Sequence, residues 1–514
     1  MFAAPTSVNR RPGAWAWALL GLVVLGAAAI RLRLLEVPLD RDEGEYAYFG
    51  RLLLQGIPPY ASAYHAKLPG TYAAYAVILA FGPSTAGIHL GLLVVNGATT
   101  LLVLLLAARL YNTTVAVAAA AVFAVLSLSP RLHGLMAYAE HFVLLPALAG
   151  TLALLRALES GRLPAFLASG VLFGLAFIAK QSGAAFGLFA VVYTLLGPGP
   201  PGTEGGGKRR LTRAAAVVAG ASVPFAAVCV AFAAAGLFDR FWFWTVTYAS
   251  DYASRVPLIV GVFLFSFSAG AILASSYFVA ILVVLGVSAL FWDPGARSRR
   301  AFVLLFSACS LAGTSVGLYF RNQYFLLLAP AAALLAGVAA DALARRAAVA
   351  PALRRALAAT LVLVVLAHVV WAERAMFFQT PPAGVARAIF GRNPFPESVE
   401  IARWVRARSA PTDRIAVIGS EPQIYFYAGL RAATGYIYMY PLMEDQPYAA
   451  RMQRQLVEEI EAAKPRFVIL VDVPSSWNLR PESDRTLFQW WERYQEGFER
   501  VGFVDITDAG TTYV

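Results

Sequence analysis

Charge and cysteine are both scarce in this sequence. Charged residues make up 14% of the 514 positions, and 59% of the residues are hydrophobic. Soluble proteins average about 25% charged residues. The only two cysteines, Cys229 and Cys309, lie inside apolar runs, so we expect no structural disulfide. The histidines form no metal-ligand spacing, and there is no heptad array or short repeat. The scarcity of charge argues against an ordinary soluble protein.

The sequence contains many long apolar runs. A run of about 20 apolar residues is long enough to cross a bilayer as a helix. We predict a polytopic α-helical membrane protein with spans at residues 14–34, 87–108, 113–130, 136–155, 163–180, 183–197, 212–236, 275–292, 302–320, 323–342 and 356–372. That makes about eleven transmembrane helices. Arg10 and Arg11 precede the first run and no small-residue cleavage site follows it, which indicates an uncleaved signal anchor.

Basic residues predict the orientation. Lys and Arg concentrate in alternate loops, for example at 208–213 and 345–355, and such loops usually face the cytoplasm. The net charge of +12 is thereby explained without a nucleic-acid partner. With a cytoplasmic N-terminus, an odd number of spans leaves the C-terminal region outside. We therefore expect a multi-pass protein of the inner (plasma) membrane. The sequence PGPPGTEGGG at 198–207 predicts a flexible cytoplasmic linker.

Residues 257–292 do not fit a single span. As one helix they would be roughly 54 Å long, against a hydrocarbon core of about 30 Å. Two spans here would invert every later loop and place the basic loops outside. We therefore predict that 257–274 is an interfacial or re-entrant helix and that 275–292 crosses the membrane.

The composition changes after Trp371, where charged residues become frequent. We divide the chain into a membrane domain, 1–372, and an extracytoplasmic α/β domain, 373–514. Short apolar segments at 414–419, 434–440, 466–472 and 498–506 alternate with helical segments, which predicts a small, partly parallel sheet. This region has no Gly-rich phosphate loop.

The first outer loop holds the densest group of acidic residues. Residues 39–48 read LDRDEGEYAY, so Asp42, Glu43 and Glu45 follow closely on the first span. Acidic groups at this depth are costly unless they face water, a metal or a substrate cavity. The alternative is a solvated turn in which tyrosines such as Tyr46 and Tyr64 form an interfacial aromatic belt.

Further ionisable residues lie at predicted outer ends of helices. Glu140, in MAYAEHFVLL, is a functional-site candidate because of its depth; a structural glutamate paired with a histidine or an arginine is the alternative. Arg321, in the outer turn YFRNQY, presents a fork of donors that suits phosphate. An arginine that merely ends a helix and reaches toward water is the alternative. Lys67 and Lys180 carry the same two interpretations.

These carboxylates and cations all fall on the predicted outer face. A membrane enzyme that uses a lipid-phosphate donor needs both kinds of group. A cation stabilises the departing phosphate, and a carboxylate takes the proton from an acceptor hydroxyl or amine.

The same residues resemble the motifs of GT-C glycosyltransferases, in the group of the protein O-mannosyltransferases and bacterial aminoarabinose transferases (glycosyltransferase family 39 type). The resemblance covers most of residues 10–345. It is carried by Asp42-Glu43 with Tyr46 after the first span, Lys67 with Pro69 in the same loop, Glu140 at the outer end of the fourth span, and Arg321 with Tyr324 in a late outer turn. The chain departs from aminoarabinose transferases at Ala66, where they carry an acidic residue.

The resemblance implies inverting transfer of a sugar from a polyprenyl-phosphate donor to a lipid, glycan or protein acceptor at the outer face. Asp42 would be the general base, assisted by Glu43 or Glu140. The implied substrate-binding residues are Lys67 and Arg321 at the donor phosphate, with Tyr46, Tyr64, Tyr324 and Lys180. No cofactor is implied with certainty, and a divalent metal stays open.

Two other functions compete with glycosyl transfer. One is a transporter or flippase of a lipid-linked saccharide, although such proteins often show internal repeats and charges near the midplane, which this sequence does not. The other is a membrane anchor for a functional outer domain, for which eleven spans would be excessive.

Overall fold

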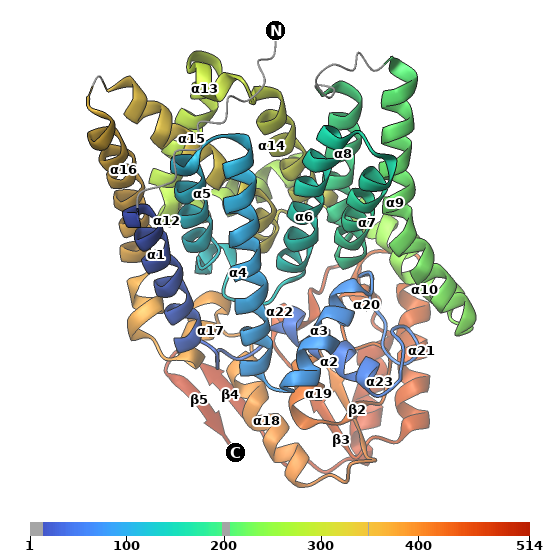
Figure 1. Cartoon of the computed structure of the whole chain (residues 1–514). Coiled ribbons are helices and arrows are strands. Elements are labelled where there is room, and N and C mark those ends of the chain that lie inside the picture. The colour runs from blue at the N-terminus through green and yellow to red at the C-terminus, as the bar shows by residue number, and fades with distance from the viewer. Residues whose placement is uncertain (1–13, 198–205, 348) are drawn as a thin grey trace. The chain divides into compact units, whose positions relative to one another are not determined.

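The computed structural model describes residues 14–197, 206–347 and 349–514 (Figure 1). The chain forms two compact units. The helical unit comprises Met1–Leu34, His89–Ala235 and Ser250–Thr380, and the mixed unit comprises Leu35–Ile88, Gly236–Ala249 and Pro381–Val514. The first loop, Leu35–Ile88, thus groups with the C-terminal region, which the division at residue 372 does not anticipate. Arg10, Arg11 and residues 198–205 of the predicted linker lie outside the described residues.

The helices of the helical unit follow the apolar runs. They are α1 (Ala14–Arg33), α4 (Thr85–Leu110, which starts in the mixed unit), α5 (Thr113–Leu126), η1 (Pro130–Leu132), α6 (Ala139–Ser160), α7 (Leu163–Ala179), η2 (Gln181–Gly183), α8 (Ala184–Leu196), α9 (Gly207–Ala234), α11 (Ala249–Ala253), α12 (Leu258–Trp292), α13 (Pro294–Arg297), α14 (Arg300–Thr314), η4 (Val316–Leu318), η5 (Asn322–Leu328), α15 (Ala329–Arg346), α16 (Pro351–Ala372) and η6 (Ala375–Gln379).

Seven helical segments of the described chain are long and apolar enough to cross a membrane, so this is a multi-pass membrane protein. They are Ala16–Arg33, Thr85–Leu110, Ala139–Ser160, Gly207–Ala234, Leu258–Trp292, Asn322–Arg346 and Pro351–Ala372. Four further predicted spans coincide with the shorter apolar helices α5, α7, α8 and α14. The total of eleven spans stays a prediction.

Small residues bring the central helices of the helical unit together. Every residue of α5 from Val115 to Leu126 is buried, and α5 packs on α1, α15 and α16. At Gly337 of α15 an added Cβ would lie 2.8 Å from the carbonyl oxygen of Val115. Close approach of this kind lets apolar helices associate where lipid supplies no hydrophobic driving force.

The long run at 257–292 forms the helix α12, which has a break inside it. Ser276 has φ −133° and ψ 21°, outside the helical region. Its hydroxyl donates a hydrogen bond to the carbonyl of Ile272 at 2.7 Å, a back-bond of the kind that bends helices. The break divides the run into two helical segments beside the predicted junction at 274/275. The re-entrant course of 257–274 stays a prediction.

The mixed unit combines helices with two small sheets (Figure 1). Its elements are α2 (Arg41–Leu54), α3 (Gly70–Phe81), α10 (Phe238–Trp242), the π-helix η3 (Phe243–Tyr248), α17 (Pro382–Phe390), α18 (Phe395–Ala407), β1 (Arg414–Ile418), α19 (Gln423–Ala428), β2 (Arg431–Ala432), α20 (Tyr440–Met443), α21 (Ala449–Ala463), β3 (Phe467–Leu470), α22 (Pro474–Trp477), α23 (Thr486–Tyr494), η7 (Gln495–Gly497), β4 (Val504–Thr507) and β5 (Gly510–Tyr513).

The sheet of the mixed unit is parallel, in the order β2-β1-β3, and β4 and β5 form a separate antiparallel hairpin. Strands therefore form at 414–418 and 467–470, within segments where the sequence predicts them. The predicted strand at 434–440 is wrong. The short strand β2 precedes this segment, whose tyrosines turn toward the first outer loop instead of alternating across a sheet.

A capping box starts α2. Asp40 accepts a hydrogen bond from the backbone N–H of Glu43 at 2.9 Å, and the Glu43 carboxylate accepts one from the backbone N–H of Asp40 at 3.5 Å. These bonds satisfy donors that a helix start leaves open. The helix packs on α3 and α19. An added Cβ at Gly44 would lie 2.5 Å from the backbone nitrogen of Gln423, so only glycine allows this approach to α19.

Candidate active site

One face of α2 carries the acidic residue best placed for chemistry. Asp42, Glu45 and Tyr46 are spaced three and four residues apart, so they share a helix face. The side chain of Asp42 is 18% exposed, whereas that of Glu45 is fully buried. Of these two carboxylates, only Asp42 is open to a molecule arriving from outside the unit.

Lys67 joins the two carboxylates. Its Nζ lies 2.8 Å from Oδ1 of Asp42 and 2.6 Å from Oε2 of Glu45. The same ammonium sits over the ring of Tyr46, 4.4 Å from the ring centroid. The hydroxyl of Tyr60 donates to the carbonyl oxygen of Lys67 at 2.6 Å, which fixes the loop that carries the lysine. We call Asp42, Glu45 and Lys67 the acidic cluster.

The other oxygen of Glu45 is also held. The hydroxyl of Tyr72, on α3, donates to Oε1 of Glu45 at 2.6 Å, and Nδ1 of His65 lies 3.4 Å from the same oxygen. Burial raises the pKa of Glu45 to about 7; Lys67 lowers it and the charge of Asp42 raises it further. For Lys67, burial lowers the pKa, but Asp42 and Glu45 outweigh burial and hold the pKa above its usual range. The lysine is therefore a cation throughout the physiological pH range.

Two predicted site residues of the first loop are in structural positions. Glu43 is completely buried and takes part in the capping box of α2. Tyr64 is 8% exposed, stacks on Trp244 with ring centroids 5.8 Å apart, and donates to Glu459 at 3.0 Å. The aromatic rings around Tyr64 join η3 to the C-terminal part of the mixed unit.

A second group lies within the helical unit. Glu140, 1% exposed at the first turn of α6, forms an ion pair with Nζ of Lys180, which lies between α7 and η2. The Lys180 ammonium sits 3.9 Å from the ring centroid of Tyr324. These three predicted residues therefore form one cluster. Arg321, in the same turn as Tyr324, is exposed and lies with its guanidinium carbon 6.0 Å from the Tyr319 ring centroid.

The predicted site residues thus form two clusters, one in each unit. Asp42, Lys67 and Tyr46 meet in the mixed unit, and Glu140, Lys180 and Tyr324 meet in the helical unit. The sequence also pointed to Glu45 without giving it a role; its i+3 spacing from Asp42 is the signal that would have assigned it. No local signal marks Tyr72 or Tyr438, whose hydroxyls donate to Glu45 and Asp42.

In the described residues, no group of three or more His, Cys, Asp or Glu side chains is arranged to hold a metal ion. In the acidic cluster the lysine ammonium lies between the two carboxylates. The cluster therefore supplies its own positive charge.

Comparison with known proteins gives one family profile that resembles part of the chain. A sequence profile of the dolichyl-phosphate-mannose-protein mannosyltransferase family matches residues 69–201. This match and the shared fold support the predicted resemblance to membrane glycosyltransferases of the GT-C superfamily. No curated protein sequence matches the chain.

Particular solved structures share the fold. ArnT from Cupriavidus metallidurans bound to undecaprenyl phosphate is 17% identical, with a TM-score of 0.61 over 98% of both chains. ArnT in the apo state is 18% identical, with a TM-score of 0.56 over 82% of this chain and 85% of that one. The archaeal oligosaccharyltransferase AglB from Archaeoglobus fulgidus, in complex with an inhibitory peptide and a dolichol-phosphate, is 13% identical, with a TM-score of 0.52 over 97% of this chain and 74% of that one.

Proposed function

We propose that this protein transfers a sugar from a polyprenyl-phosphate donor to an acceptor at the outer face of the membrane, with inversion at the anomeric carbon. The family profile matching residues 69–201 and the fold shared with ArnT and AglB support a lipid-phosphate donor. The sugar is a hexose or a pentose, and the acceptor is a lipid, a glycan or a protein.

The acidic cluster is the observation that carries the proposal. Asp42 is partly exposed and lies 2.8 Å from a lysine that remains protonated. An adjacent cation keeps a carboxylate ionised, which a general base requires. Glu45 is too deeply buried for this role, and it serves to hold Lys67.

In the proposed reaction, Asp42 takes the proton from an acceptor hydroxyl or amine. The acceptor atom attacks the anomeric carbon from the side opposite the phosphate, so the new bond forms as the bond between the sugar and the phosphate oxygen breaks. The electron pair of that bond leaves on the lipid phosphate. Lys67 stabilises the phosphate: an ammonium has three N–H donors, two of which face Asp42 and Glu45.

The Glu140 cluster assists from the helical unit. Lys180 neutralises Glu140, and its position over the ring of Tyr324 fixes the ion pair. We assign this cluster to substrate binding, with Glu140 as an assisting carboxylate.

The substitution Asp42→Asn tests the base. Loss of a general base lowers the rate by about 10²- to 10⁴-fold, so we expect kcat to fall into that range with little change in binding of the lipid donor. Glu36→Gln is the matched control, since Glu36 is an exposed carboxylate in the same loop. Purified wild-type protein is incubated with a panel of polyprenyl-phosphate sugars, and sugar release is measured. Full activity of the Asn variant would remove Asp42 from the mechanism.

The proposed topology is eleven spans with a cytoplasmic N-terminus, a membrane domain over 1–372 and an extracytoplasmic C-terminal α/β domain over 373–514. The apolar helices and the basic loops support it. A protease-cleavable tag after Val514 in sealed inside-out and right-side-out vesicles tests the orientation. We expect cleavage only when the periplasmic or external side is accessible; cleavage from the cytoplasmic side would reverse the assignment.

A further inference from the structure

A tyrosine from the C-terminal region reaches the proposed base. The hydroxyl of Tyr438 donates to Oδ1 of Asp42 at 3.0 Å, the same oxygen that lies 2.8 Å from Nζ of Lys67. All three residues belong to the mixed unit, although Tyr438 is 396 positions from Asp42 in the sequence. Tyr438 is 4% exposed, so this hydroxyl has little access to bulk water.

Hydrogen bonds of the neighbouring backbone fix the position of Tyr438. The N–H of Met439 donates to Oγ of Ser420 at 2.9 Å, and the Ser420 hydroxyl donates to the carbonyl of Ser476 at 2.5 Å. Ser420 and Ser476 lie just beyond the carboxyl ends of β1 and β3, which are paired in parallel. The edge of the small sheet thereby supports the segment that carries the tyrosine. The ring itself contacts His65 and Tyr440, with centroids 5.0 Å and 5.7 Å away.

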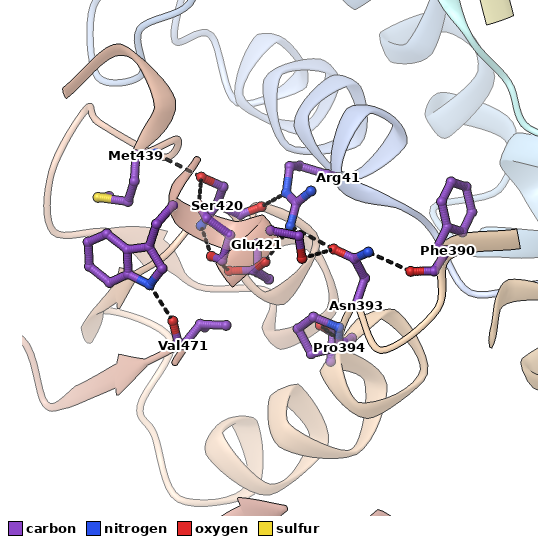
Figure 2. Close-up of polar contacts among 12 residues, drawn as sticks. Arg41, Phe390, Asn393, Pro394, Ser420, Glu421, Met439 and Val471 are labelled. Carbon is purple, nitrogen blue, oxygen red and sulfur yellow. Dashed lines mark hydrogen bonds and ion pairs between the residues drawn. The ribbon is translucent and has the colours of Figure 1, made fainter. Parts of the chain in front are cut away.

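The residue next to Asp42 is bound to the same sheet edge. Figure 2 shows Arg41 pointing toward Ser420, Glu421 and Asn393. Its Nε donates to the carbonyl of Ser420 at 2.5 Å, and its Nη2 lies 2.8 Å from Oε1 of Glu421 and 3.1 Å from Oδ1 of Asn393. Glu421 is completely buried, and its second oxygen accepts from the Ser476 hydroxyl at 2.6 Å.

This arrangement restrains the start of α2 from two sides. The Arg41–Glu421 pair fixes the backbone one residue before Asp42, and Tyr438 fixes the carboxylate itself. A base must be held within a fraction of an ångström of its productive position, and packing with hydrogen bonds from surrounding residues provides that.

We propose that Tyr438 is a positioning residue for Asp42, so that the C-terminal region completes the active site. The inference rests on the proposed function. A hydrogen bond donated to an ionised carboxylate stabilises the ionised form, and it also limits the rotamers of the side chain. Tyr438 thus keeps Asp42 deprotonated and oriented.

Other charged and titratable groups also lie around Asp42. They are Lys67 and His65 from the first loop, Asp40, Arg41, Glu43 and Glu45 at the start of α2, Tyr72 and Tyr75 of α3, and Tyr438 and Tyr440 from the C-terminal region. Lys67 and Tyr438 both contact Oδ1 of Asp42. Removing the tyrosine hydroxyl leaves the lysine in place and removes one donor to this oxygen.

The substitution Tyr438→Phe tests the proposal in the purified full-length protein. A hydrogen bond to a charged group is stronger than one between neutral groups, so we expect kcat to fall by about 10-fold or more near neutral pH. The KM for the lipid donor should stay the same. The acidic limb of the pH–rate profile should move to higher pH by about one unit, so that raising the pH restores part of the activity. Tyr436→Phe is the matched control, because its hydroxyl donates to Gln455.

A double-substitution cycle separates positioning from general damage. In the Asp42→Asn background, Tyr438→Phe should have no further effect on the rate, because the group that it positions is gone. Partial misfolding would scale all rates equally and would leave the pH midpoint unmoved. An unchanged kcat and pH profile in Tyr438→Phe, with an active wild type, would overturn the inference while the proposed function stands. An inactive wild type with every donor tested would instead reject the proposed function.

Discussion

Both units of this protein hold a lysine against acidic residues, but the balance of charge differs. In the mixed unit, Lys67 contacts two carboxylates, Asp42 and Glu45, so the acidic cluster has one negative charge in excess when both are ionised. In the helical unit, Lys180 contacts Glu140 alone, and that pair is neutral. A surplus carboxylate suits a proton acceptor, whereas a neutral pair suits a fixed binding surface.

The two clusters also differ in how far their acidic groups are buried. Glu140 is 1% exposed, and its partner is packed over an aromatic ring. Asp42 is 18% exposed, although the carboxylate next to it in the cluster is completely buried. A charge in a membrane protein is tolerated where it is paired or faces a cavity. The helical unit uses pairing, and the mixed unit leaves one acidic group accessible.

The largest expected difference between the two clusters is the loss of stability when each lysine is removed. Lys67→Met leaves a buried glutamate without its cation, and breaking a buried pair this way costs about 3–5 kcal/mol. We expect Lys180→Met to cost less, because it removes the cation from one carboxylate instead of two. Thermal unfolding of both variants in the same detergent measures the difference. Equal losses would show that the surplus charge has no energetic consequence.

The next largest effect concerns activity. Glu140→Gln should lower kcat/KM by about 10-fold, because an assisting group contributes less than the base itself. Glu159→Gln on the same helix is the control, with a side chain that is 62% exposed. A loss as large as that of Asp42→Asn would assign the base to the helical unit.

Arg41→Lys sharpens the comparison within the mixed unit. Lysine keeps the charge but cannot reproduce the fork that contacts Ser420, Glu421 and Asn393. We expect about a 5-fold fall in kcat, corresponding to roughly 1 kcal/mol, together with a lower Tm. The control is Arg403→Lys, since Arg403 is exposed and pairs with Glu400 on its own helix, α18. Equal kcat values in both variants would show that the contacts of Arg41 with the sheet edge do not affect activity.

The smallest expected effect is on the pH dependence of stability. Burial raises the pKa of Glu45 to about 7 from its ordinary value of 4.5, so the folded state holds this proton more tightly than the unfolded chain does. The contribution therefore favours folding below about pH 4.5 and is lost as the pH rises through 7. Glu45→Gln should flatten this part of the curve of Tm against pH between 5 and 8. A slope identical to that of the wild type would contradict the raised pKa.

The membrane part was largely predictable because hydrophobicity acts locally along the chain. Helices occur at all eleven predicted spans, and the break at Ser276 lies next to the predicted junction. The strand predicted at 434–440 failed for a complementary reason. Its aromatic and β-branched residues match a strand pattern, but the hydroxyl of Tyr438 has a tertiary partner in the first loop, and tertiary contacts override propensity.

The site was predictable as residue types and only partly as contacts. Asp42, Lys67, Glu140 and Lys180 stood out because charged groups near apolar helix ends are costly. Their partners were not evident: Lys67 lies 25 positions from Asp42, and Lys180 lies 40 positions from Glu140. Glu43 was selected with its neighbours, whereas in the structure it serves the helix cap.

By itself, the sequence determined that long apolar helices form and where acidic and basic groups interrupt them. The reason is that the free energy of moving side chains out of water depends on local composition and periodicity. Only the tertiary structure decided that the first loop and the C-terminal region form one unit, and that Tyr438 and Lys67 meet on one oxygen of Asp42. Such contacts join residues that are hundreds of positions apart, and short-range sequence patterns do not predict which of these residues meet.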